Sequence, residues 1–154
     1  MIKVSLSPEE IKFATDLGEL RHNESIRQGK KDAHGLKISR EEAKKLDIIG
    51  AIGELAVAVA LGIPFDATVN TWKAPDLGDL LQVRTATKHN YSLLVRPGDK
   101  DEEVFVLTTC ENLPDFHIHG WLWGKEAKQK QWLRSPHGRP AAYFVPISEL
   151  NMLE

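Results

Sequence analysis

The chain of 154 residues contains a single cysteine, Cys110, so no disulfide can form within it. Proteins without disulfides are typical of reducing compartments, which predicts a cytoplasmic location. Residues 104–110 have the composition of a buried strand, which favours a structural thiol over a reactive one. The first residues lack a basic segment followed by an apolar run, so no signal peptide is predicted.

Long apolar runs and an excess of one charge are also missing. The longest apolar stretch, around Leu55 to Ile63, is too short to cross a bilayer, so no membrane partner is predicted. Charged residues form 27% of the chain and the formal net charge is -2. Proteins that coat nucleic acid non-specifically are usually basic. Contact with DNA or RNA would therefore need a local basic patch.

The length and the apolar fraction of 42% fit one globular domain, spanning residues 1–154, with a core of its own. Ser7-Pro8-Glu9-Glu10 has the residues of a capping box, and apolar residues then recur at helical spacing. This pattern predicts an N-terminal helix over about residues 7–28. The polar, glycine-punctuated segment 27–35 predicts an exposed loop after it.

Ser39, followed three residues later by Glu42, predicts the start of a second helix. We expect this helix to break near Gly50 and then to continue until Gly62 and Pro64 end it. Its second half is small and apolar nearly all round, as in a helix buried in the middle of a domain.

Strand-like segments dominate the rest of the chain. The first two, 80–87 and 91–95, are predicted to pair through a turn near 88–90. The remaining expected elements are strands over 103–109 and 116–123, a short helix over 125–133 and an edge strand over 142–145. This order predicts a single α/β domain with a central mixed sheet flanked by helices.

Glu54 is unusual because it lies in the most apolar helix of the chain, between Gly53 and Leu55. An ionised carboxylate is costly to bury without a partner. Two interpretations are open. Glu54 either caps a helix end or reaches solvent at a break near Gly50 and Gly53, or it points into a polar pocket where a metal ion or another cation offsets its charge.

Gln82 and Arg84 alternate along a predicted strand and therefore share one of its faces. Leu77-Gly78 permits a tight reversal that would bring Asp76 back beside Gln82. Carboxylate, amide and carbonyl oxygens are the ligands of hard cations such as Mg²⁺. The segment is compatible with a metal site, and also with an ordinary turn and strand in which Asp76 and Arg84 form an ion pair.

Three pieces follow one another between residues 48 and 109: Gly53-Glu54 on a buried helix, then Pro75-Asp76, then Gln82-Val83-Arg84. In this order they resemble the PD-(D/E)xK nuclease superfamily. The resemblance implies a restriction-endonuclease-like α-β-β-β-α-β core, with Glu54, Asp76 and Gln82 around a metal ion and Arg84 beside them. The wider pattern is similar to small phage-type proteins of this class, in Lys88-His89-Asn90-Tyr91, Gly120-Trp121-Leu122-Trp123-Gly124 and Val145-Pro146.

Two positions depart from the superfamily pattern. Gln82 stands where an acid is more usual, so it keeps an oxygen ligand but loses a charge. Arg84 stands where lysine is usual, and because arginine effectively cannot lose its proton it should not act as a general base. Lys88 is either a displaced catalytic lysine or a solvated turn residue. Asp79 is the rival of Asp76 as metal ligand, and Asp76 is preferred because it follows a proline, as in the motif.

The resemblance implies a Mg²⁺- or Mn²⁺-dependent deoxyribonuclease that hydrolyses phosphodiester bonds of DNA, with RNA as the alternative substrate. The metal would activate water and stabilise charge on the phosphate, while Arg84 and Lys88 would add fixed positive charge. A phage-encoded member would act in the host cytoplasm, and the oligomeric state stays open, a dimer included. Contacts to the nucleic-acid backbone are expected from four basic residues: Arg27, Lys30, Lys31 and Arg96.

Two other hypotheses use the same residues. A catalytically weak or inactive nuclease fold could bind nucleic acid or a protein partner without cutting, which Gln82, Arg84 and the acidic net charge favour. Alternatively, the Asp76–Arg84 pair is purely structural, in a small virion or regulatory protein. His117 and His119 face one side of a predicted strand and could bind zinc, but the sequence shows no third ligand, so a polar sheet face is expected.

Overall fold

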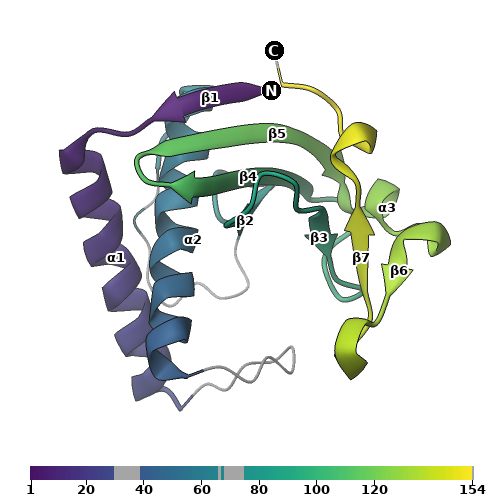
Figure 1. The fold of residues 1–154 in the computed structure, drawn as a ribbon, viewed down its shortest axis with the longest axis horizontal. Coiled ribbons are helices and arrows are strands. Elements are labelled where there is room, and N and C mark those ends of the chain that lie inside the picture. Colours follow the sequence, from purple (N-terminus) through teal and green to yellow (C-terminus); the bar gives the residue numbers. More distant parts are fainter. Residues whose placement is uncertain (30–38, 66, 68–74, 154) are drawn as a thin grey trace.

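The computed structural model describes residues 1–29, 39–65, 67 and 75–153. Its elements form layers: helices α1 and α2 lie side by side, α2 is packed on a four-stranded sheet, and a smaller sheet lies across from them (Figure 1). The prediction of a single α/β domain with a mixed sheet and flanking helices is confirmed. Among the described helices, none combines the length and apolar character needed to span a bilayer.

Both long helices begin where the sequence predicts. α1 (Pro8–Arg27) starts at Ser7, whose hydroxyl accepts the Glu10 N–H at 3.1 Å while the Glu10 carboxylate accepts the Ser7 N–H at 2.8 Å. α2 (Arg40–Leu61) starts at Ser39 and ends at Gly62, which takes the left-handed conformation with φ +66°. The predicted break near Gly50 is wrong. The cost of glycine in a helix is about 1 kcal/mol, which packing along a 22-residue helix outweighs.

The larger sheet has the strand order β1-β5-β4-β2. Strand β2 runs parallel to β4, whereas β5 is antiparallel to both β4 and β1, so the sheet is mixed. β1 is an N-terminal edge strand that the sequence patterns did not predict. The strands are β1 (Ile2–Ser5), β2 (Leu81–Ala86), β4 (Val104–Asn112) and β5 (Asp115–Trp123).

The smaller sheet corrects two predictions. β3 (Leu93–Val95) does not pair with β2 but with β7 (Ala142–Val145), and β7 is the central strand rather than an edge, with β6 (Leu133–Arg134) on its other side. β3 lies outside the larger sheet because two of its three apolar side chains, Leu93 and Val95, are buried with Phe105 and Leu107 on that sheet's face. In place of the single helix predicted over 125–133, the chain forms a short helix, α3 (Gly124–Ala127), and a 3₁₀ turn, η1 (Lys130–Trp132). The other 3₁₀ turns are η2 (Pro136–Gly138) and η3 (Ile147–Glu149).

The core lies on both faces of the larger sheet. On one face, α2 contributes Ile52, Ala56 and Val57 against apolar residues of β2, β4 and β5. On the other face, the smaller sheet covers Phe105 and other apolar residues. Cys110 is buried in the helix-side core, as predicted for a structural thiol. Burial of β4 on both faces explains its nearly continuous apolar sequence.

A close contact between α2 and β2 fixes the position of the helix. A Cβ atom at Gly53 would lie 2.1 Å from Thr85 Oγ1 and 2.8 Å from Thr85 Cγ2. Only glycine therefore allows the helix to approach the strand this closely. Thr85 Oγ1 is buried and has no hydrogen-bond partner among the described residues, so the contact is steric rather than polar.

We predict that Gly53→Ala lowers the free energy of unfolding by about 1–3 kcal/mol, because the new methyl group overpacks this contact. Gly50→Ala is the matched control on the same helix, since a Cβ there meets no atom within 4 Å. It should stabilise the protein by about 0.5–1 kcal/mol. Urea denaturation measures both changes.

Thr85→Ala removes the two closest atoms and should relieve the clash. The double variant Gly53→Ala/Thr85→Ala should then be more stable than the sum of the two single changes predicts. Strict additivity of the two changes would show that the Gly53–Thr85 contact does not set the distance between α2 and β2.

Candidate functional site

Asp76 lies beside the outer edge of β2. The chain reverses at Gly78, which has a φ of +56°, and Leu77 pairs with Leu81 in an antiparallel bridge. This is the reversal that the sequence predicts. It turns the Asp76 carboxylate toward β2, where Oδ2 accepts the Val83 N–H at 2.7 Å. Asp79 is exposed on the same turn, so Asp76 is the aspartate that faces the strand.

Glu54 points into a polar environment within the domain. Its side chain comes from α2 directly after Gly53 and the residue is only 8% exposed. Its Oε2 accepts a hydrogen bond at 2.7 Å from Nη1 of Arg21, which α1 supplies. Burial, and after it repulsion from Asp76, raise the pKa of Glu54 to about 7, against the opposing effect of Arg21. The two carboxylates are therefore close enough to repel each other.

Gln82 contacts a third carboxylate, that of Glu103, which the sequence did not single out. Its Nε2 donates to Glu103 Oε2 at 2.8 Å, and Glu103 is 6% exposed just before β4. Leu81 pairs with Val104, so the parallel register of β2 and β4 brings Glu103 beside Gln82. The sequence shows Glu103 only as the last of three consecutive acids, 101–103, ahead of an apolar strand. Nothing in that pattern separates it from its exposed neighbour Glu102.

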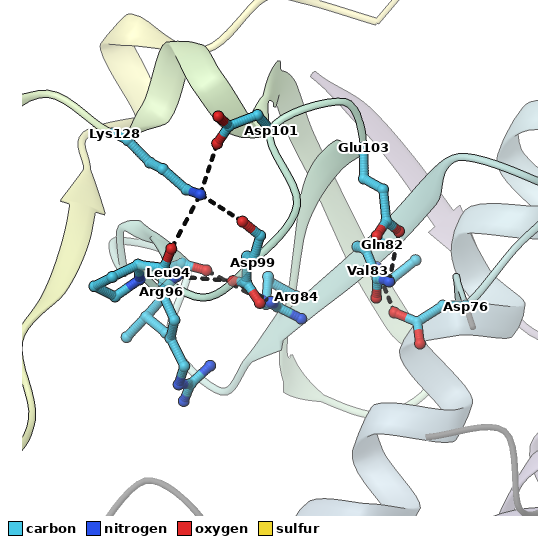
Figure 2. Close-up of polar contacts among 11 residues, drawn as sticks. Asp76, Gln82, Val83, Arg84, Leu94, Arg96, Asp99, Asp101, Glu103 and Lys128 are labelled. Atoms are coloured by element: carbon cyan, nitrogen blue, oxygen red, sulfur yellow. Dashed lines mark hydrogen bonds and ion pairs between the residues drawn. The ribbon is translucent and has the colours of Figure 1, made fainter. Parts of the chain in front are cut away.

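Arg84 turns away from this group of carboxylates (Figure 2). Its Nη2 donates to Asp99 Oδ2 at 2.7 Å, its Nε donates to the Leu94 carbonyl at 3.0 Å, and its guanidinium lies 5.0 Å from the centre of the Phe105 ring. Arg84 therefore forms its ion pair with Asp99, and not with Asp76 as the sequence had suggested. Arg84 still affects Asp76 at longer range, because its charge lowers the pKa of that carboxyl while burial, the largest effect, raises it.

The loop that carries Asp99 is held in place by Lys128 (Figure 2). The Lys128 ammonium lies 2.7 Å from Asp101 Oδ1 and donates to the carbonyls of Pro97 and Asp99. Asp99 also accepts the Arg96 N–H at 2.8 Å. The position of the Arg84 guanidinium is therefore fixed by a loop with several polar supports.

Glu54, Asp76, Gln82 and Glu103 thus lie around the outer edge and start of β2. Charge effects link the acids, because Asp76 raises the pKa of Glu54 and Glu103 raises that of Asp76. Their ligand atoms do not all meet at one point, however. Among the described residues, the one group of three ligand-type side chains within 4.8 Å of one another is His89, His117 and His119.

Two of the basic residues proposed for catalysis or nucleic-acid contact, Lys88 and Arg27, lie in different segments of the fold. Lys88 is exposed beyond the end of β2, where it lowers the pKa of Glu111 rather than facing the carboxylates. Arg27, at the end of α1, is bonded to Glu24. Lys30 and Lys31 lie outside the described residues.

Arg96 lies at a cavity next to Arg84. This cavity has a volume of about 510 Å³ and runs along the face of β2 that carries Arg84. Tyr91, Asn90 and Phe144 contribute to its walls. A second cavity of about 620 Å³, lined by residues including Arg139, shares Leu94, Arg96 and Phe144 with the first. The two arginines Arg84 and Arg96 therefore border one space open to a ligand.

No protein-family model, curated protein or solved structure is similar enough to the chain to count as a match. The function must therefore be argued from the residues of this chain.

The raised pKa of Glu54 predicts that the free energy of unfolding depends on pH. Its pKa is near 4.5 when unfolded and about 7 when folded, so between these pH values only the folded state keeps the proton. The free energy of unfolding should therefore fall as pH rises from about 4.5 to about 7, by up to about 3 kcal/mol from this group. Glu54→Gln should remove this part of the decline, as measured by denaturation at each pH.

Glu102→Gln is the control, because Glu102 is exposed and precedes the same strand as Glu103. It should leave the pH profile of the parent protein unchanged. A Glu54→Gln profile that declines as steeply as the parent's would show that Glu54 is not held as a destabilised carboxylate.

Proposed function

We propose that the chain is a metal-dependent nuclease that hydrolyses phosphodiester bonds of DNA, with Mg²⁺ or Mn²⁺ as its ion. The observation that carries the proposal is the placement of Glu54, Asp76, Gln82 and Glu103 around the edge of one strand, where burial disfavours the charge of Glu54 and Asp76. The order of Glu54, Asp76 and Gln82 is also that of the PD-(D/E)xK pattern. The lone buried cysteine suits action in a reducing cytoplasm.

The donor set fits a hard divalent cation in its chemistry. Carboxylate and amide oxygens are the ligands that Mg²⁺ and Mn²⁺ prefer. Glu54, Asp76 and Glu103 would hold the ion, with the Gln82 amide oxygen as a neutral ligand, and its charge would offset the repulsion among the acids. When bound, such an ion lowers the pKa of water and stabilises charge on a phosphate.

Arg84 would serve the phosphate side of the site. Its planar guanidinium cannot act as a base, but it can donate to phosphate oxygens and stabilise growing negative charge. The bonds to Asp99 and to the Leu94 carbonyl hold it at the border of the 510 Å³ cavity. Arg96 borders the same cavity, and Tyr91, which is 51% exposed, offers a ring on which a base could stack.

A second candidate function, a binding module that does not cut, is favoured by two contacts. The charge of Arg84 is already balanced by Asp99, and that of Glu54 by Arg21. In addition, the three carboxylates are not among the groups of described residues placed closely enough to hold a metal ion. Such a module would hold nucleic acid in the cavity of Arg84 and Arg96 and would need no metal.

Cleavage of supercoiled, linear and single-stranded DNA with Mg²⁺ or Mn²⁺ tests the proposal. Asp76→Asn should abolish cleavage, whereas Asp79→Asn, on the exposed part of the same turn, should leave it near the parent rate. Arg84→Ala should slow cleavage by about 10²–10³-fold, as for other preorganised charge-stabilising groups, and Arg84→Lys should retain more activity.

Equal cleavage by the parent and Asp76→Asn would show that the site is misassigned. If the parent protein never cuts, but binds DNA in the presence of a chelator and loses that binding in Arg84→Ala, the binding module is the correct function.

Metal binding can be measured without cleavage. Mn²⁺ should raise the melting temperature of the parent protein at pH 8, because an ion that binds only the folded state stabilises it. Asp76→Asn should lose most of this increase and Asp79→Asn should keep it, as measured by calorimetry. An increase that is equal in all three proteins would place the ion elsewhere.

A further inference from the structure

Three histidines meet on the face of the larger sheet that lies opposite α2, where the residues 107–109 of β4 pair with β5. His117 and His119 come from β5, and His89 comes from the turn after β2. One ring nitrogen from each lies within 4.8 Å of those of the other two. The third ligand that the sequence does not reveal is thus His89, 28 positions before His117 in the chain.

His119 lies at a β-bulge of β5. Leu107 pairs with Gly120 and Thr108 pairs with Ile118, so His119 is the extra residue that has no partner on β4. A bulge redirects a side chain and often occurs next to functional sites. His119 lies on the same face as His117, as strand alternation predicts, and it is only 9% exposed.

Neighbouring polar groups form hydrogen bonds with two of the histidine rings, those of His89 and His119. The Thr109 hydroxyl lies 2.6 Å from His89 Nδ1 and 2.7 Å from His119 Nε2. Because a hydroxyl has one proton, it donates to one ring and accepts from the other. Only the ring whose N–H it accepts keeps its second nitrogen unprotonated for a metal, so the other ring would give up its hydrogen bond from Thr109 when an ion binds. The backbone N–H of His89 also donates to Glu111 Oε2 at 2.8 Å, which holds the turn against β4. Hydrogen bonds of this kind orient the ligands of metal sites.

Histidine binds a metal through a neutral imidazole, and groups of both charges surround these rings. Burial lowers the pKa of both His117 and His119, and each is lowered further by a neighbouring histidine. Lys3 and the N-terminal amine add positive charge on this side, while Glu111 and Asp115 oppose it at His117. Glu111 therefore supplies negative charge close to the rings.

We propose that His89, His117 and His119 form a binding site for one borderline divalent transition-metal ion, of which Zn²⁺ is the representative. Three imidazoles leave a fourth tetrahedral position for water or another ligand. Imidazole nitrogen suits Zn²⁺, Cu²⁺ and Ni²⁺, whereas Mg²⁺ requires oxygen ligands. The site is therefore chemically distinct from the carboxylates around β2.

Binding requires one ring to turn. The rings of His89 and His117 are stacked, with centroids 3.7 Å apart and planes 9° from parallel. Two parallel rings cannot both aim an in-plane lone pair at one ion, but the terminal torsion of histidine is broad and permits the rotation. The ion would then join the turn after β2 to β5 across β4.

Titration of tag-free, metal-stripped protein with Zn²⁺ tests this site, with heat of binding and melting temperature as readouts. The parent should bind one ion here and melt at a higher temperature with Zn²⁺ present. His117→Asn and His89→Gln, which change partly exposed residues, should each weaken this binding by at least about tenfold. The control His137→Asn changes an exposed histidine with φ +55°, a conformation that asparagine tolerates, and should bind like the parent.

Circular dichroism and melting without metal show that each variant is folded. Asp76→Asn should keep the Zn²⁺ site, and excess Mg²⁺ should not displace the ion, so this proposal can fail or succeed independently of the nuclease. It is overturned if the parent binds no Zn²⁺, or if both cluster variants bind it as tightly as His137→Asn does.

Discussion

The contact between Gly53 and Thr85 is the constraint on which the rest of the structure depends. Without a side chain at Gly53, α2 lies directly against β2, and the next residue, Glu54, is carried into the space beside the strand edge. A larger residue at Gly53 would move the helix outward and separate Glu54 from Asp76. The steric requirement at one position thus determines whether the two carboxylates share an environment.

Opposite charges balance this arrangement only in part. Arg21 bonds to Glu54, but burial and Asp76 still raise the pKa of Glu54 to about 7. Arg84, the nearest cation on β2, is held by Asp99 instead of by the acids. The interior therefore keeps an excess of negative charge beside one strand edge. An excess of this kind is a cost to folding, and a cation that bound there would remove it.

The larger sheet places two groups of polar side chains at different positions. Carboxylate and amide groups gather where β2 begins, and imidazole groups gather where β5 bulges past Thr108. Both depend on pairing with β4, since its register with β2 positions Glu103 and its shift against β5 positions His119. β4 is buried on both faces, so it is the rigid element from which both groups are held.

The sequence alone determined the helix caps at Ser7, Ser39 and Gly62. It also determined the strand positions and the turn that returns Asp76 to β2. These features follow from the sequence because capping, alternation and glycine geometry act over a few neighbouring residues. The pairing of β3 with β7, the burial of Glu103 and the contact of His89 with His117 and His119 were decided by tertiary structure alone. Each joins segments distant in the chain, and which strands pair depends on the competition of all apolar faces for one core.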